Sequence, residues 1–268
     1  MDAIKNASFC VLLAAILGCA WLTIRARMSR AEWRKAYEAI RVRAIHENDA
    51  FAPFGLVALF TVSTLLAGGA PQAPEANPIS FVVGSLTLPI MLLATVFLPI
   101  LIRNSGFRAS LGTLSITRRD MATGVRSAFA MLLPMAALGA LSILVERLFE
   151  GQVEQQALLN WIKEPETATW RKIFLVASAV LVSPIAEELT FRGVILAALS
   201  KRCGIVSAVL VSSLFFGAIH LSLDFFLPLS CAGACFALGY IATGRIGTSI
   251  AMHATFNAVS IACTFLGS

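Results

Sequence analysis

Two adjacent glutamates and an arginine stand together in an otherwise apolar stretch, Ala186-Glu187-Glu188-Leu189-Thr190-Phe191-Arg192-Gly193. Glu188 and Arg192 are four residues apart, so on a helix they share a face and can form an ion pair. Glu187 is rotated by about 100° from Glu188 and cannot easily use the same arginine. We therefore expect Glu188 and Arg192 to form a structural pair, and Glu187 to be a free carboxylate that suits a general base.

Two of the three histidines also lie in apolar segments, each four residues from a second side chain on the same helix face. His220 follows Phe216, and His253 precedes Asn257. A single histidine in such a segment is more often a packing residue. Two histidines, an asparagine and the spare Glu187 on neighbouring segments instead indicate a catalytic site.

The elements that position these residues must be membrane-spanning helices. The chain has 268 residues, of which 58% are hydrophobic and 13% charged, with a mean hydropathy of +0.82. A soluble domain has about a quarter charged residues, and a helix needs about 20 apolar residues to cross the bilayer core. We predict an all-α, polytopic transmembrane helix bundle of about eight spans. The predicted spans are residues 7–24, 52–70, 79–102, 127–145, 173–199, 204–221, 225–243 and 248–267.

This pattern divides the chain into two regions of four spans each. Residues 1–172 form an N-terminal transmembrane region with basic loops, and residues 173–268 form a core that carries the candidate site. We see no internal repeat and no low-complexity segment.

Lys and Arg are distributed unevenly over the predicted loops. Fifteen of them fall in 25–51, 103–126, 200–203 and 244–247, on one side of an eight-span chain, and five fall on the other side. The positive-inside rule therefore places the basic loops in the cytoplasm and both termini outside. The net charge of +6 accordingly indicates membrane lipid headgroups, and not nucleic acid, as the anionic partner.

The candidate residues do not lie at one depth in this arrangement. Counted from the cytoplasmic turns, Glu187 and His220 lie about 20 and 24 Å deep, but His253 lies only about 8 Å deep. A turn at 244–247 that dips into the bundle would reconcile these depths, and so would a water-filled cytoplasmic cavity. Both explanations stay open.

One basic loop carries a helical pattern of its own. Ser29 and Glu32 fit a capping box, and Trp33, Tyr37 and Ile40 recur at helical spacing among basic residues. We predict an interfacial helix lying on anionic headgroups, with an ordinary soluble loop helix as the alternative.

The three chemical motifs, in this order, resemble the signature of the CPBP family, which comprises the type II CAAX prenyl proteases and the bacteriocin-processing Abi proteins. They are Glu187-Glu188-x-x-Phe191-Arg192-Gly193, Phe216-x-x-x-His220 and His253-x-x-x-Asn257. Each motif alone is weak, but together and in order, within apolar spans, they are specific. The resemblance covers about residues 173–268 and leaves 1–172 unmatched.

The resemblance implies peptide hydrolysis by an activated water without a covalent intermediate. Glu187 would be the general base on the water, assisted by His220. His253 and Asn257 would stabilise the oxyanion of the tetrahedral intermediate.

Two further roles follow from the same resemblance. Glu188 and Arg192 would support the site by holding its arrangement. The family has also been described as metal-dependent, and Glu187, His220 and His253 would then be zinc ligands. We favour the mechanism without a cofactor, because nothing in the sequence establishes the geometry of the third ligand.

The predicted function is that of an intramembrane endopeptidase which cuts a membrane-associated protein or peptide near the cytoplasmic face. Other intramembrane proteases are excluded because the sequence has no HExxH, GxSG or GxGD motif. The short loops are typical of a prokaryotic cell membrane protein, so a prenylated substrate is not implied. The alternatives are a non-catalytic scaffold or bacteriocin-immunity protein of the same fold and, last, a transporter, because the polar groups are confined to the second half. The sequence indicates neither the substrate nor the oligomeric state.

Overall fold

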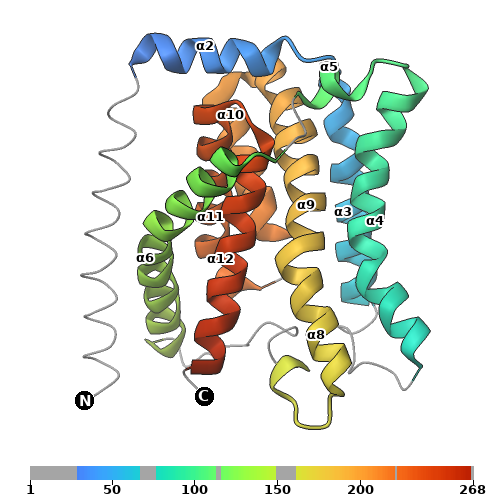
Figure 1. Ribbon diagram of the computed structural model, residues 1–268, viewed down its shortest axis with the longest axis vertical. Coiled ribbons are helices and arrows are strands. Elements are labelled where there is room, and N and C mark those ends of the chain that lie inside the picture. Colours follow the sequence, from blue (N-terminus) through green and yellow to red (C-terminus); the bar gives the residue numbers. More distant parts are fainter. Residues whose placement is uncertain (1–28, 67–76, 113–115, 149–160, 221, 267–268) are drawn as a thin grey trace.

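The computed structural model describes residues 29–66, 77–112, 116–148, 161–220 and 222–266, and these fold into helices that run side by side (Figure 1). The predicted all-α class is confirmed. The elements are α2 (Arg30–Arg41), the short 3-10 helix η1 (Glu47–Ala50), α3 (Phe51–Leu66), α4 (Pro78–Ile102), α5 (Phe107–Leu111), α6 (Arg118–Leu148), α8 (Thr169–Ala177), the π-helical segment η2 (Ser178–Val182), α9 (Ser183–Glu188), the π-helical segment η3 (Leu189–Ile195), α10 (Leu196–Ala218), α11 (Leu223–Thr243) and α12 (Ile246–Leu266).

Five helices in the described part of the chain are long and apolar enough to cross a membrane. They are Pro78–Ile102, Arg118–Leu144, Thr169–Ala218, Phe225–Thr243 and Ile246–Cys263. The predicted span 7–24 lies outside the described residues, and α3 has 16 residues. The number of eight spans therefore stays a prediction, as does the side of the membrane on which each end lies.

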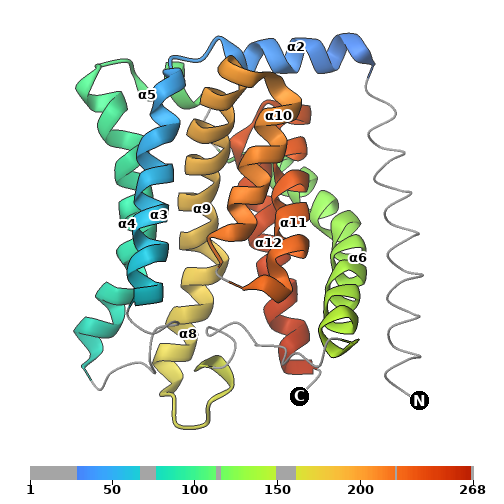
Figure 2. The same cartoon turned by 180° about the vertical axis from the view of Figure 1, so that it is seen from behind.

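The longest of these helices makes two passes through the bundle. Thr169–Ala218 is continuous over 50 residues, but Gly204 interrupts it with φ 79° and ψ 168°. Only glycine adopts that backbone conformation without strain, and the chain reverses there, so that α9 and α10 lie side by side (Figure 2). The two predicted spans 173–199 and 204–221 correspond to these two passes.

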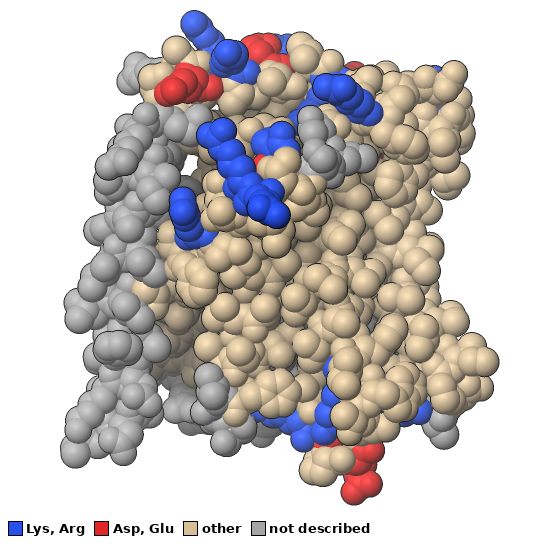
Figure 3. Space-filling view, viewed as in Figure 1, with Lys and Arg blue, Asp and Glu red and all other residues tan. Residues whose placement is uncertain are grey.

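The surface of the bundle confirms that it lies in a membrane. Large apolar side chains are exposed on several helices, with Ile79 at 72% and Val206 at 70%. A water-soluble surface rarely carries such side chains together. Figure 3 shows a broad uncharged band between an end rich in Lys and Arg, where α2 lies, and a second charged end near α8. The protein is therefore an integral membrane helix bundle.

The predicted loop helix is α2, which lies across one end of the bundle (Figure 1). Its capping box is present: Glu32 N donates to Ser29 Oγ at 3.2 Å, and Ser29 N donates to the Glu32 carboxylate at 2.7 Å. Ile40 is fully buried against the bundle, and the Tyr37 hydroxyl donates to the Ser200 carbonyl at 3.1 Å. The helix is confirmed, but its apolar side covers other helices. Contact with lipid headgroups stays a prediction.

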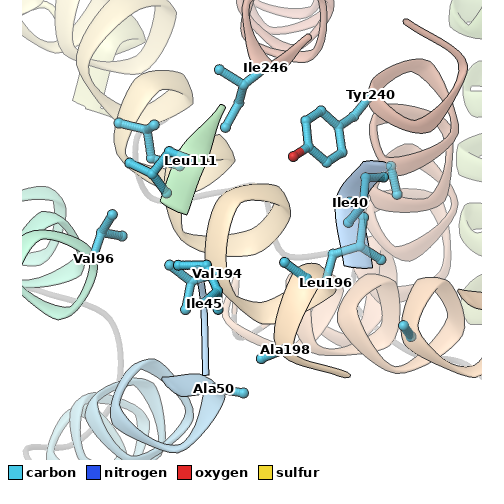
Figure 4. Packing of buried hydrophobic residues seen from close by; sticks show 14 of the residues in the cluster. Ile40, Ile45, Ala50, Val96, Leu111, Val194, Leu196, Ala198, Tyr240 and Ile246 are labelled. Atoms are coloured by element: carbon cyan, nitrogen blue, oxygen red, sulfur yellow. The ribbon is translucent and has the colours of Figure 1, made fainter. Parts of the chain in front are cut away.

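An apolar cluster beneath α2 joins this helix to the spans. Ile40, Leu111, Leu196, Tyr240 and Ile246 come from five different helices and are each at most 1% exposed. Figure 4 shows them converging on one another. The position of α2 is thus tied to the ends of α10, α11 and α12.

The crossing of α6 and α12 depends on a glycine. A Cβ on Gly124 would lie 2.6 Å from both the Ala251 Cβ and the Thr248 carbonyl oxygen. Without that Cβ the two backbones can approach closely, as small residues allow between membrane helices. The close approach fixes α12, which carries His253 and Asn257.

We expect Gly124→Ala to separate α6 from α12, because its new methyl group would overlap backbone atoms that cannot rotate away. Overpacking of this kind costs about 1–3 kcal/mol, so the variant should unfold at a lower temperature in mild detergent than the wild type. Gly139→Ala is the matched control, because a Cβ on this second α6 glycine would meet no atom within 4 Å. Equal melting temperatures for the two variants would contradict the proposed close crossing.

Candidate active site

The helix that carries the two glutamates is interrupted on both sides of them. The π-helical segments η2 and η3 flank the six-residue α9, Ser183–Glu188. π-helical turns are rare within α-helices and frequently occur at functional sites. Each one adds a residue to the helical turn, so the two segments change the register of the helix on both sides of the glutamates.

Pro184 accounts for the first interruption. A proline has no N–H to donate and its ring clashes with the preceding turn of a helix. Ser183 N–H bonds to the Ser178 carbonyl, five residues back, and in the same pattern the Ala179 carbonyl would need the N–H that Pro184 lacks. The Asn257 carboxamide supplies the missing donor, because its Nδ2 lies 2.8 Å from the Ala179 oxygen. Asn257 therefore links α12 to η2.

The predicted ion pair between Glu188 and Arg192 is present at the centre of the bundle. Arg192 Nε lies 3.1 Å from Glu188 Oε2, and the two side chains are at most 1% exposed. Arg192 Nη2 also donates to the Gly233 carbonyl of α11 at 2.7 Å. The guanidinium lies 5.1 Å from the centroid of the Phe216 ring and 5.5 Å from that of Phe236. The arginine thus joins α11 to the helix of the glutamates.

Glu188 holds His253 as well as Arg192. His253 Nδ1 lies 3.1 Å from Glu188 Oε1, and the Ser249 hydroxyl donates to Glu188 Oε2. The imidazole ring stacks on Phe236, with a centroid distance of 4.6 Å and an interplanar angle of 18°. A buried carboxylate at one ring nitrogen fixes the orientation of a histidine, so the His253 Nε2 atom has a defined direction.

That direction leads to Glu187. His253 Nε2 lies 3.9 Å from Glu187 Oε2, which is too long for a hydrogen bond but close enough to act on a common water or substrate group. Glu187 Oε2 is buried and has no hydrogen-bond partner among the described residues. Glu187 is therefore the free carboxylate that its position in the sequence predicts.

His220 ends α10 beside the same group of rings. Its Nδ1 lies 2.8 Å from the Phe216 carbonyl oxygen, one helical turn back. The Phe216 ring contacts both histidine rings, at centroid distances of 5.1 Å to His220 and 5.5 Å to His253. The structure thus brings His220 and His253 together at Phe216, and His253 is the one that reaches Glu187.

The contact between His253 and Glu187 bears on the two explanations for their different predicted depths. His253 lies eight residues after Arg245, about 12 Å along a helix, whereas Glu187 lies 17 residues before Gly204, about 25 Å along a helix. Because their side chains nonetheless meet, the turn at 244–247 must lie deeper in the bundle than the turn at Gly204. This contact favours the dipping turn, and the water-filled cavity stays untested.

Two arginines hold this deep turn. Arg245 forms an ion pair with Asp120 at the start of α6. Arg43 reaches down from the end of α2, where its Nη2 donates to the Gly244 carbonyl at 3.4 Å and its guanidinium lies 5.0 Å from the centroid of the Tyr240 ring. Burial lowers the pKa of Arg43 to about 10.

The residues predicted as alternative zinc ligands are only partly assembled. No three His, Cys, Asp or Glu side chains in the described ranges are arranged so that they could hold a metal ion. Zinc requires bonds of about 2.0–2.2 Å to nitrogen and oxygen ligands. Glu187, His220 and His253 would have to move closer together to bind zinc.

Comparison with known proteins locates a family match on this same part of the chain. Residues 169–259 match the family described as type II CAAX prenyl endopeptidase Rce1-like. The chain is also 35% identical over 85 residues to a Bacillus subtilis (strain 168) protein named "Putative membrane peptidase YdiL", over 32% of this chain and 34% of that protein. No solved structure matches.

Residues 169–259 are thus similar to the type II CAAX prenyl endopeptidases, in agreement with the resemblance to the CPBP family. The family match covers the three motifs, from the glutamates of α9 to Asn257 in α12. The chain spans about a third of the length of its Bacillus subtilis relative, and the match says nothing of residues 1–168. The division at residue 172 therefore stays a prediction.

Some residues of this candidate site were not predicted from the sequence. Ser249 lies four residues before His253, so the helical spacing that pairs His253 with Asn257 would also have indicated it. The link between Asn257 and the Ala179 carbonyl carries no such signal, because the two residues are 78 positions apart. Pro184 is the residue that indicates such a link, because a proline inside a span leaves one carbonyl without its helical donor.

We expect Arg192→Ala to destabilise the protein strongly, because it leaves the Glu188 carboxylate buried and without its cation. Removing one partner of a buried pair costs about 3–5 kcal/mol, so the yield of monodisperse protein in mild detergent should fall. Arg192→Lys should recover only part of that yield, because an ammonium group cannot reproduce the planar, multiple contacts of a guanidinium. Arg126→Ala, at an exposed arginine of α6, is the control. A fully folded Arg192→Ala protein would show that the pair has no structural role.

Proposed function

We propose that the protein is an intramembrane endopeptidase, which hydrolyses a peptide bond of a membrane-associated protein or peptide with a water activated by Glu187. The family match and the relative named as a membrane peptidase support a protease of the membrane. The observation that carries the mechanism is the chain of contacts from Glu188 through His253 to Glu187. It leaves one buried carboxylate paired and a second one free beside an oriented histidine.

In this mechanism Glu187 accepts a proton from a water molecule as the water oxygen attacks the carbonyl carbon of the substrate. The carbonyl oxygen becomes an oxyanion in a tetrahedral intermediate. As this intermediate collapses to a carboxyl group, the C–N bond breaks and Glu187 returns the proton to the nitrogen of the departing amine. His220 contacts the same Phe216 ring as His253, and in this proposal it orients the water. A positioned general base of this kind contributes about two to four orders of magnitude to the rate.

The oxyanion needs donors, and His253 Nε2 is one of them in this proposal. Because His253 Nδ1 faces the Glu188 carboxylate at 3.1 Å, that nitrogen carries a proton. Donation from Nε2 then requires the ring to carry both protons. Arg192 keeps the Glu188 carboxylate in place.

Asn257 is the second proposed donor, but its Nδ2 is engaged by the Ala179 carbonyl at 2.8 Å. The carboxamide nitrogen carries a second N–H. In this proposal the second N–H donates to the oxyanion, while the first keeps its bond to Ala179.

We expect Asn257→Ala to lower kcat by about two to three orders of magnitude, which is the usual effect of removing an oxyanion donor. The loss of one hydrogen bond to Ala179 should cost only about 1 kcal/mol of stability. Cleavage rates and melting temperatures measured on the same preparation separate the two effects. Thr255→Val, which removes a hydroxyl bonded within the same helix, is the control. A drop in kcat of less than tenfold with a large loss of stability would show that Asn257 only supports η2.

The decisive variant is Glu187→Gln, which keeps the shape of the side chain but cannot accept a proton. We expect it to fold and to be extracted from membranes like the wild type, yet to lose at least about two orders of magnitude of activity. The assay is cleavage of a quenched-fluorescent peptide library by purified protein in lipid nanodiscs. Glu38→Gln, at an exposed glutamate of α2, is the control.

The same assay with a strong zinc chelator tests the cofactor. We expect the activity to resist the chelator, as the glutamate mechanism requires. Chelator-sensitive activity would instead assign Glu187, His220 and His253 to a zinc site that closes when the metal binds.

Cleavage at the wild-type rate by Glu187→Gln would contradict the mechanism. A folded wild-type protein that cuts no peptide in the library would favour the scaffold or immunity function.

A further inference from the structure

An apolar groove runs along the half of the bundle that lies away from α2. One wall is α8 with η2, the other is the second half of α12, and the volume between them is about 660 Å³. This is within the range of about 300–1,000 Å³ that is usual for ligand sites. The groove arises because small side chains, Ala177, Ala258 and Ala262, stand between larger ones such as Val176 and Phe265.

The groove continues the face of α12 that carries the candidate active site. His253, Asn257, Ile261 and Phe265 follow one another at intervals of four residues, so they lie on one side of the helix. The last two line the groove. The other wall includes Val180, which adjoins the Ala179 carbonyl that Asn257 holds. The inner end of the groove is therefore the Asn257 link, and the catalytic carboxylate lies beyond it.

The distance from the groove to the reacting groups is short. His253 lies five residues from Ala258, about 8 Å along α12, and Glu187 lies seven residues from Val180, about 10 Å along the other wall. An extended chain covers about 3.3–3.6 Å per residue. A ligand seated in the groove would thus reach the space between Glu187 and His253 with about three further residues.

The lining also defines the chemistry of the occupant. Lys172 is the charged residue of the lining, and the other lining residues are apolar. Lys172 lies near the outer end of the groove, at the start of α8, and makes no ion pair within the described ranges. The site therefore fits a ligand that is apolar along its length and carries a negative charge at one end.

We propose that this groove binds the apolar, membrane-embedded segment of the substrate polypeptide, with an acidic side chain or terminal carboxylate at Lys172. The proposal rests on the proposed function and names its substrate class: a membrane-anchored polypeptide that is cut about three residues from its embedded segment, on the side toward α2. A soluble peptide without such a segment would reach Glu187 without using the groove.

Photocrosslinking tests the groove without depending on cleavage. The probe is a synthetic peptide of about 20 leucine and alanine residues, enough to span the bilayer, with glutamate at its outer end. The full chain carries a benzophenone amino acid in place of Ile173 in the groove, or in place of Leu141 on α6, in phosphatidylcholine nanodiscs. Both positions are exposed, at 64% and 51%. We expect at least a fivefold higher yield of peptide adduct from position 173.

Two substitutions test the shape and the charge of the groove. Ala262→Trp should fill the groove and abolish the adduct at position 173, whereas Ala136→Trp, at an exposed alanine of α6, should leave it unchanged. Lys172→Glu should reverse the preference between a glutamate-ended and a lysine-ended probe, by about two- to fivefold in each direction, as expected for a partly exposed ion pair.

Adducts that are equal at both positions, or that contain only phospholipid, would overturn the proposal. A different set of results is expected if the groove binds the peptide but the protein is not a protease. In that case the peptide adduct at position 173 would keep its dependence on Ala262 and Lys172, while no peptide would be cleaved by the wild type.

Discussion

The arrangement of this bundle depends on one buried carboxylate. Glu188 is fully buried, and an isolated charge in such an environment is too costly to retain. Arg192, His253 and Ser249 compensate it, and each brings its own helix or a neighbouring one to the same point. Arg192 extends the network to the Gly233 carbonyl of α11. One requirement for charge compensation thus sets the relative positions of α9, η3, α11 and α12. It leaves Oε2 of the adjacent Glu187 without a hydrogen bond to the described residues.

The helical class, the reversal near residue 204 and the ion pair of Glu188 with Arg192 could all be predicted from the sequence. Each depends on local spacing or on composition, which the sequence states directly. The depth of the turn at 244–247 could not be predicted, because it is set by distant contacts of Arg43 and Asp120. For α2, the helix itself could be predicted, but not the surface that it covers. Its apolar face is visible in the sequence, but not whether protein or lipid covers that face.

The candidate site follows the same division between local and distant information. Sequence spacing alone singled out Glu187, His220, His253 and Asn257. It could not show that Glu188 orients His253, because residues 65 positions apart meet only in the folded bundle. It also could not show that the Asn257 carboxamide donates a hydrogen bond to the Ala179 carbonyl. The sequence therefore indicates which residues belong to the site, whereas the contacts between helices determine how each one is held.

Pro184 has a consequence that depends on the position of its helix in the lipid bilayer. It leaves the Ala179 oxygen dependent on Asn257, and an unsatisfied carbonyl in apolar surroundings costs about 1–3 kcal/mol. No water is present in hydrocarbon to replace the donor that Pro184 lacks. The Asn257 carboxamide supplies it, so the proline makes the close approach of α12 to η2 a requirement of the membrane setting.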